Sequence, residues 1–317
     1  GELKMSQELP NAKYITIHDN QSKIELFLLE MLIKPHLAAL NWSNITNQTP
    51  NLKIGYPSQH LASLIVGMKG TATGARGNDI VDGSEVKSCC RLDQSDKCKN
   101  CNKSVLRNDS ECPYCGSKYI KRNNDSKWLI PIRSDLELKM ALEETPRFIF
   151  MLYDYPMFEE GNFNEARIVM YEIWPKSKRS YNFRTLLNNY YEYLYKPHII
   201  KNPSRTPAPK NFWPESFQFY MCNPVKIFEC HIHNWQSNMT SVEITHLIGP
   251  SEDRSKLKSE DLPIELLNGE ERDILRAKGI SLHSLKAVDE DLKKLLDLRD
   301  TDKKPKDIGV KQSKEEF

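Results

Sequence analysis

The sequence lacks the features of membrane and secreted proteins. None of its apolar runs reaches the roughly 20 residues that a membrane-spanning helix requires. Its first ten residues, GELKMSQELP, lack the apolar region of a signal peptide. Without a secretory signal, disulfide bonds are not expected among the 8 cysteines. We therefore expect a cytoplasmic protein that does not bind a membrane.

The chain also has little excess charge. Its 45 Lys and Arg residues against 43 Asp and Glu leave a formal net charge of only +2. Net charge therefore does not indicate nucleic-acid binding, and any surface of that kind must be a local patch. Apolar residues make up 39% of the sequence, which is enough for a packed core. A chain of 317 residues has room for one large domain or two ordinary ones.

Four of the cysteines form two CxxC pairs. Cys98 and Cys101 make the first pair, and Cys112 and Cys115 make the second. Thiolates at this spacing can surround one Zn²⁺ tetrahedrally, and the sequence Cys-Pro-Tyr-Cys-Gly supplies residues that favour a tight turn. Two disulfides or a redox pair are the alternatives, but a reducing compartment and two motifs so close together favour structural zinc. The remaining cysteines are predicted to be packing residues: Cys89, Cys90, Cys222 and Cys230.

The nine residues DIVDGSEVK, from Asp79 to Lys87, predict a tight hairpin. Asp82-Gly83 is a turn dipeptide flanked by strand-forming residues. With a three-residue loop over 82–84, Val81 would pair with Glu85, and Asp79 would pair with Lys87. Because side chains alternate along a strand, Asp79, Glu85 and Lys87 would then share one face.

Two carboxylates and a lysine on one face suit metal-dependent hydrolysis. The carboxylates can hold Mg²⁺, and the ammonium can orient a water molecule or stabilise a phosphate. A charged hairpin tip is more often a solvated turn, so the motif alone does not establish a site. Asp82 is the alternative to Asp79, since a slip of one residue in the turn would reverse the faces.

The order of predicted elements indicates an α/β (α+β) fold. A mixed central sheet flanked by helices is expected, because strands and helices alternate along the chain. Ser58 would cap the second helix, and Pro35 would break or kink the first. Helices are predicted over 22–40, 59–68, 135–144 and 182–195, and strands over 128–132, 147–153, 166–174, 217–221 and 225–230. We expect a core over 1–249 with the cysteine element inserted at about 90–122, a helical region over 250–300, and a disordered tail over 301–317.

A resemblance to a known family adds to these patterns. A helix, a Gly-containing loop, a strand bearing Asp79, and then Glu85-Val86-Lys87 resemble the PD-(D/E)xK nuclease superfamily. The attached four-cysteine element looks like a type II restriction endonuclease, and the run GARGNDIVDGSEVKSC is similar to the MamI-type group. The resemblance covers roughly residues 57–174. The chain departs from the superfamily pattern where Asn78, not proline, precedes Asp79, and where the spacing to Glu85 is short.

The resemblance implies a restriction-endonuclease-like core and Mg²⁺-dependent cleavage of double-stranded DNA at a specific sequence, in a bacterial cytoplasm. Asp79 and Glu85 would bind Mg²⁺, and Lys87 would orient the attacking water. A further carboxylate from the first helix, Glu25 or Glu30, is also implied. The enzyme would act as a homodimer, because a two-fold axis matches a palindromic site.

Basic residues supply candidate DNA contacts. Lys69 and Arg76 lie in the loop before Asp79 and could hold phosphates, although solvated loop charges are as common. The cysteines have basic surroundings interleaved with two tyrosines: Lys97, Lys99, Lys103, Arg107, Lys118, Lys121 and Arg122. Two other functions remain open: a repair or junction-resolving nuclease on the same core, and a zinc-ribbon DNA-binding regulator without catalysis. The leucines of the region 250–300 would either form a dimer face or pack against their own domain.

Overall fold

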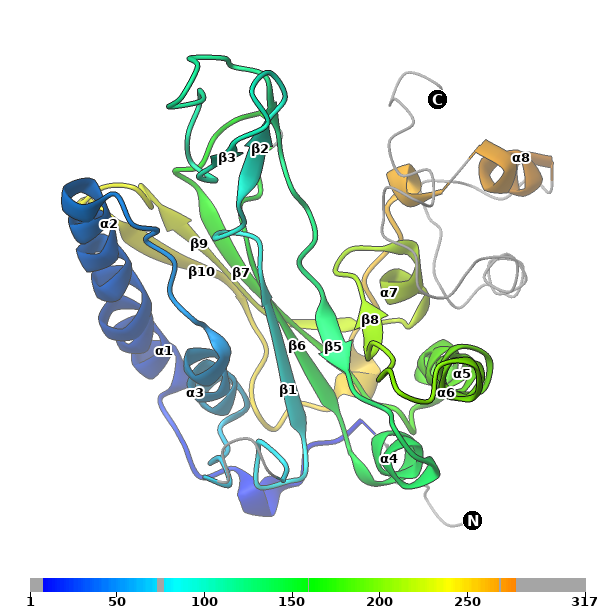
Figure 1. The fold of residues 1–317 in the computed structure, drawn as a ribbon. Coiled ribbons are helices and arrows are strands. Elements are labelled where there is room, and N and C mark those ends of the chain that lie inside the picture. Colours follow the sequence, from blue (N-terminus) through cyan, green and yellow to red (C-terminus); the bar gives the residue numbers. More distant parts are fainter. Residues whose placement is uncertain (1–7, 73–76, 159, 268, 278–317) are drawn as a thin grey trace, which may run out of the picture.

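The centre of the molecule is a five-stranded mixed sheet (Figure 1). The computed structural model describes residues 8–72, 77–158, 160–267 and 269–277. The strands follow in the order β1 (Glu85–Cys90), β6 (Phe148–Asp154), β7 (Ala166–Ile173), β9 (Val225–His233) and β10 (Ser241–Leu247). β1 runs parallel to β6, and the other neighbours are antiparallel. The predicted mixed sheet is confirmed, and β1 lies at one edge of it.

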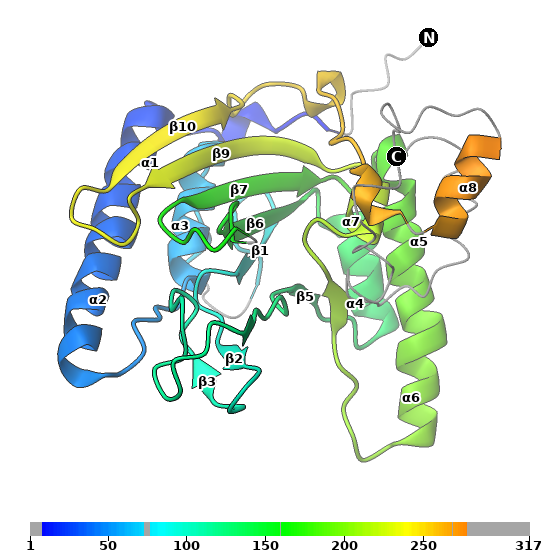
Figure 2. The same ribbon diagram turned by 90° about the horizontal axis from the view of Figure 1, so that it is seen from above.

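A long helix and a shorter one cover one face of the sheet (Figure 2). The long helix comprises α1 (Asn20–Leu28), a π-helical turn (Leu29–Ile33) and α2 (Lys34–Thr46). A break at Pro35, one of the two predicted outcomes, does not occur. The helix continues to Thr46. The π-helical turn ends two residues before Pro35, whose missing N–H would interrupt a regular helix ladder.

The shorter helix, α3 (Gly55–Val66), begins four residues before its predicted start. Ser58 is therefore not the cap. Its hydroxyl donates to the Ile54 carbonyl at 2.6 Å inside the first turn, and it lies 3.0 Å from the hydroxyl of Tyr153. Gly67 ends the helix with a φ of +69°, a conformation that favours glycine. α3 packs next to β1.

The other face of the sheet packs against helices with an aromatic core. Trp128, Phe150 and Phe212 lie at its centre, with ring centroids 4.9 to 6.1 Å apart. The elements here are β5 (Trp128–Ile130), α4 (Asp135–Lys139) with a π-helical turn (Met140–Glu144), α5 (Tyr181–Asn189) with a π-helical turn (Tyr190–Tyr195), α6 (Lys196–Lys201), β8 (Lys210–Phe212) and α7 (Phe217–Met221). β5 and β8 pair as a separate two-stranded sheet.

The prediction of a strand over 217–221 is wrong. These residues form α7, because the Ser216 hydroxyl accepts a hydrogen bond from the backbone N–H of Phe219 at 3.2 Å and caps a helix. All five side chains of α7 are buried, so the apolar run carried no periodicity that distinguishes a helix from a strand.

The four-cysteine element is a small sheet of β2 (Asp96–Cys98), β3 (Ser104–Val105) and β4 (Ile120–Lys121). Asp96 is buried and accepts from Arg107 at 2.9 Å and from Arg122 at 2.8 Å. Arg107 also donates to the carbonyl of Arg91 at 3.1 Å, which joins the element to the end of β1. These two arginines therefore hold the element together and are not part of an exposed basic surface.

The C-terminal region is described as far as Ala277. It contains two short 3₁₀ helices (Arg254–Lys256 and Ile264–Leu266) and α8 (Gly269–Ala277). Leu262, Leu266 and Leu267 pack into the chain's own core. The rest of the predicted helical region, and the predicted tail, lie outside the described residues. Within the part of the chain that the structure describes, no helix has the length and apolar character needed to cross a bilayer.

Candidate active site

The turn before β1 is displaced from its predicted register. The Gly83 N–H donates to the Ile80 carbonyl at 2.9 Å, and the Ile80 N–H donates to the Ser84 carbonyl at 3.2 Å. The three-residue loop is therefore 81–83, and the predicted pairing of Asp79 with Lys87 is wrong. Asp79 lies beside Glu85 instead, because its carboxylate contacts the Val86 N–H and the Glu85 side chain.

Asp79 is held by two hydrogen bonds. Its Oδ2 accepts from the backbone N–H of Val86 at 2.8 Å, and its Oδ1 accepts from the side-chain amide of Gln59 at 2.9 Å. Each carboxylate oxygen keeps a further lone pair for another partner. Gln59, on α3, was not predicted, because its contact with Asp79 spans 20 residues and depends on how α3 packs beside β1.

Glu85 is half-buried next to Asp79. Burial, followed by a hydrogen bond with Asp79, raises the pKa of Glu85 to about 7, although nearby Lys87 acts in the opposite direction. Two carboxylates this close are stabilised by a cation between them. Hard oxygen donors of this kind fit Mg²⁺. Because the Val86 N–H faces Asp79, the Val86 carbonyl points to the same open edge of β1 and offers a third oxygen.

Glu85→Gln should stabilise the protein above pH 7 when no divalent cation is added. In the unfolded chain Glu85 ionises near pH 4.5, whereas in the folded chain it ionises at about 7. The wild type therefore loses stability as the pH rises between these values, and the glutamine variant does not. Denaturant unfolding should give a difference of about 2 kcal/mol at pH 8 and none at pH 4. Exposed Glu30→Gln is the control, and equal curves for Glu85→Gln and wild type at pH 8 would contradict the raised pKa.

Asp82 points away from this pair. Its Oδ1 accepts from the Ser84 N–H at 2.9 Å, and its Oδ2 forms an ion pair with buried Arg147 at 3.2 Å. Of the two aspartates considered from the sequence, Asp79 is thus the one beside Glu85.

An open cavity of about 400 Å³ lies beside Asp79. It is lined on one side by α3, including Gln59, and on the other by 70–72. Exposed Lys69 directly precedes this second wall. Arg76 lies outside the described residues. Glu25 and Glu30 are exposed on the long helix and do not line the cavity.

The four cysteines of the small sheet converge as predicted. Their sulfur atoms all lie within 4.8 Å of one another. The Sγ atoms of Cys98 and Cys115 are 3.6 Å apart, and those of Cys101 and Cys112 are 3.5 Å apart. Tetrahedral Zn–S bonds of about 2.3 Å give S–S edges of about 3.8 Å, so the cluster fits a zinc ion.

Two tight turns shape this cluster. Asn102 (φ +61°) donates its N–H to the Cys98 carbonyl at 3.0 Å, and Gly116 (φ +70°) does the same to Cys112 at 2.8 Å. Each turn reverses the chain after its CxxC pair, so that both sulfurs point inward. Of these two turns, the one at Gly116 is predicted by the sequence, because glycine follows the second CxxC pair.

Lys99 and Lys103 lie over exposed tyrosines of the element. The Lys103 Nζ is 4.4 Å from the centroid of the Tyr114 ring, and the Lys99 Nζ is 5.6 Å from that of Tyr119. Both tyrosines are exposed. Asp79 contacts the start of β1 at Val86. The element lies at the other end of this strand (Figure 1), about 17 Å away by the rise per residue. It is therefore not adjacent to the carboxylates.

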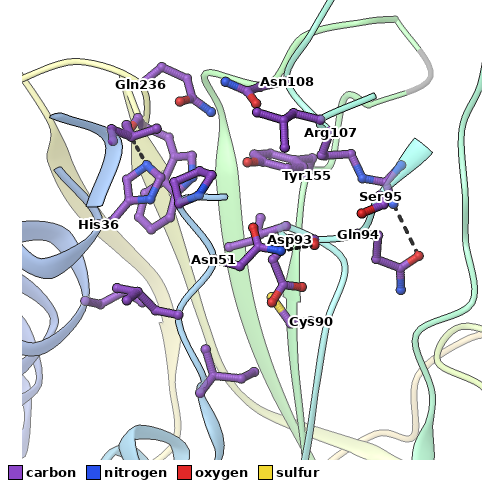
Figure 3. A pocket seen from close by; sticks show the side chains of 18 residues that line it. His36, Asn51, Cys90, Asp93, Gln94, Ser95, Arg107, Asn108, Tyr155 and Gln236 are labelled. Atoms are coloured by element: carbon purple, nitrogen blue, oxygen red, sulfur yellow. Dashed lines mark hydrogen bonds between the residues drawn. The ribbon is translucent and has the colours of Figure 1, made fainter. Parts of the chain in front are cut away.

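A second cavity, of about 60 Å³, lies where α2 meets the cysteine element (Figure 3). His36 stacks on Trp235 with ring centroids 3.7 Å apart and contacts the Trp235 carbonyl at 3.0 Å. Burial lowers the pKa of His36 to about 4, so the ring is neutral at pH 7. Cys90, the last residue of β1, lines this cavity. The cavity therefore lies at the far end of β1 from Glu85.

Comparisons with known proteins identify the family of the chain. The model of the MamI restriction endonuclease family matches residues 41–265, which include both the carboxylates and the cysteine cluster. The type II restriction enzyme MamI of Microbacterium ammoniaphilum is 31% identical over 106 residues. That stretch is 30% of this chain and 34% of the relative, so only about a third of the relative's length is matched. No solved structure matches the chain.

Proposed function

The chain belongs to the MamI restriction endonuclease family, and we propose that it is a type II restriction endonuclease of the PD-(D/E)xK kind. It hydrolyses phosphodiester bonds of double-stranded DNA at a specific sequence, with Mg²⁺. The observation that carries the proposal is the placement of Asp79 beside Glu85 at the start of an edge strand, with Lys87 near enough to lower the pKa of Glu85.

Asp79 and Glu85 would hold the metal, and the Val86 carbonyl would complete the oxygen donors from the chain. Bound Mg²⁺ would lower the pKa of a water molecule and neutralise the charge that develops on the phosphate. Gln59 keeps Asp79 turned toward the cavity, since it donates to Oδ1. Ionised Glu85 is required for metal binding, so a proton is released when the metal binds below pH 7.

Lys87 follows Glu85 by two residues on β1 and projects to the same face. Its ammonium would orient the attacking water or stabilise the negative charge on the phosphate. No residue needs to form a covalent intermediate, because a water molecule is the nucleophile.

The cysteine cluster would hold structural Zn²⁺, and the element would contact DNA through Lys99 and Lys103. Figures 1 and 2 place it on the side of the sheet where the edge strand β1 lies. DNA lying along that edge would reach both the carboxylates and the element, because about 17 Å corresponds to roughly five base pairs of duplex. Lys69 and Arg76 would hold phosphates next to the cleaved bond.

The double substitution Lys99→Ala and Lys103→Ala should weaken DNA binding equally for all sequences. Each lost phosphate contact makes the negative slope of log K against log[salt] less steep by about 0.9, so its magnitude should fall by about 2. Fluorescence anisotropy in Ca²⁺ at several salt concentrations measures it. The control is Lys13→Ala with Lys196→Ala, since these lysines also lie over tyrosine rings, at 4.8 and 4.9 Å, but outside the element. An unchanged slope would exclude the element from the interface.

We propose that the enzyme acts on DNA in the bacterial cytoplasm as a homodimer. A two-fold axis would place one carboxylate site on each strand of a symmetric sequence. Analytical ultracentrifugation with and without a cleavable duplex tests this, and a monomer that cuts both strands would contradict it.

Incubation with plasmid DNA, with and without Mg²⁺, tests the proposed function. Discrete fragments that require Mg²⁺ are expected. Smears, or cuts confined to branched DNA, would indicate a repair or junction-resolving nuclease. Absence of cleavage, or cleavage unaffected by Glu85→Ala and Lys87→Ala, would contradict catalysis at this site and favour a DNA-binding regulator.

A further inference from the structure

A buried arginine lies directly behind the turn that carries the two carboxylates. Arg147 is 0% exposed. Its Nε donates to the Ser84 hydroxyl at 2.9 Å, and its second guanidinium nitrogen contacts Asp82 at 3.2 Å. These two contacts hold both sides of Gly83, whose φ of +95° makes the turn possible.

The same residue also holds the start of β1 through its backbone. The Arg147 carbonyl accepts from the N–H of Glu85 at 3.2 Å. One residue therefore fixes the turn through its side chain and Glu85 through its main chain. The position of Asp79 is fixed in turn, because its Oδ2 accepts a hydrogen bond from the N–H of Val86, the residue after Glu85.

The guanidinium is itself kept in place by a second carboxylate. Arg147 pairs with Glu172 at 3.1 Å, and Glu172 pairs with Arg254 at 3.1 Å. All three side chains are fully buried. Such a paired and hydrogen-bonded group has one geometry available, since any displacement leaves a buried charge without its partner.

We propose that Arg147 is a positioning residue of the nuclease centre: through Ser84, Asp82 and the Glu85 N–H it sets the separation at which Asp79 and Glu85 bind the metal. This rests on the proposed function. Metal ligands must be held to within about 0.5 Å, and a residue that orients ligands changes metal affinity without touching metal or DNA.

Ser84→Ala is the variant that tests this inference. It removes one hydrogen bond from Arg147 at a fully buried position where alanine fits. Arg147→Ala would instead leave Asp82 without its ion-pair partner and Glu172 with Arg254 as its remaining cation, which would destabilise the whole chain. The Mg²⁺ concentration that half-saturates single-turnover cleavage should rise about 10-fold or more. The affinity for DNA in Ca²⁺ should stay within about 2-fold of wild type, because Ser84 is buried away from the proposed DNA contacts.

Ser180→Ala is the matched control, because Ser180 is also buried (1% exposed) and lies outside this network. A second variant, Arg147→Lys, keeps the charge but lacks the planar fork, and it should raise the metal requirement in the same way. A normal metal requirement in both variants, with only a lower melting temperature, would overturn the inference and leave the proposed function standing. If wild-type protein neither cuts DNA nor binds Mn²⁺ in calorimetry, the proposed function is wrong, and the inference fails with it.

Discussion

Asp79→Asn is expected to lower the single-turnover rate of DNA cleavage by about 10³-fold or more. The amide can still accept from the Val86 N–H, so the fold persists, but one of the two anionic metal ligands is lost. Stability should not fall, because the substitution removes one of two neighbouring negative charges. Gel assays with enzyme in excess over DNA measure the rate, and Asp93→Asn, at the other end of β1, is the control.

Asp82→Asn should behave differently. It breaks an ion pair with fully buried Arg147, so unfolding should become easier by about 3 kcal/mol. Cleavage by the remaining folded protein should be impaired far less than in Asp79→Asn, and higher Mg²⁺ should restore it. The assignment of the two aspartates is reversed if Asp82→Asn abolishes cleavage at every Mg²⁺ concentration while Asp79→Asn cuts at the wild-type rate.

Cys112→Ala is expected to release the zinc and unfold the element locally. Zinc content should fall from about one ion per chain to a small fraction of that, since three thiolates and an open position bind far more weakly than a closed site. The backbone amides of 96–121 should lose protection against hydrogen exchange, because the small sheet has little core besides the cysteines. Elemental analysis and exchange mass spectrometry measure the two effects.

Cys90→Ala is the matched control for the zinc prediction. Cys90 also lies close to the element in sequence, but it is not among the clustered sulfurs. The Cys90→Ala variant should keep its zinc, and its backbone amides should stay protected against hydrogen exchange. Full zinc content in Cys112→Ala would show that the cysteine cluster is not the zinc site.

Hydrophobic periodicity along the sequence predicted most of the helices and strands correctly. The strands over 147–153, 166–174 and 225–230 and the helices over 135–144 and 182–195 are all present, with ends shifted by a few residues. The misassigned segment 217–221 is buried on all sides, so its pattern could not distinguish a helix from a strand. Its capping serine, Ser216, is the one local signal that points to the helix.

The sequence predicts a set of residues for the candidate site, but not the contacts that hold them. The alternation of side chains predicts Asp79, Glu85 and Lys87 on one face, and the structure does bring Asp79 and Lys87 close to Glu85 although the turn is displaced. Gln59 and Arg147 could not be found in the same way. Their contacts with Asp79 and Ser84 span 20 and 63 residues, and they exist only because α3 and β6 pack on either side of β1.

A crystal of the protein with Mn²⁺ in place of Mg²⁺ and a bound duplex tests the account most directly, because anomalous scattering locates the ion without reference to activity. The account predicts a peak bound by carboxylate oxygens of both Asp79 and Glu85, at about 2.0 to 2.2 Å. A peak bound by Asp82, or no peak between Asp79 and Glu85 while the duplex is bound, would contradict it.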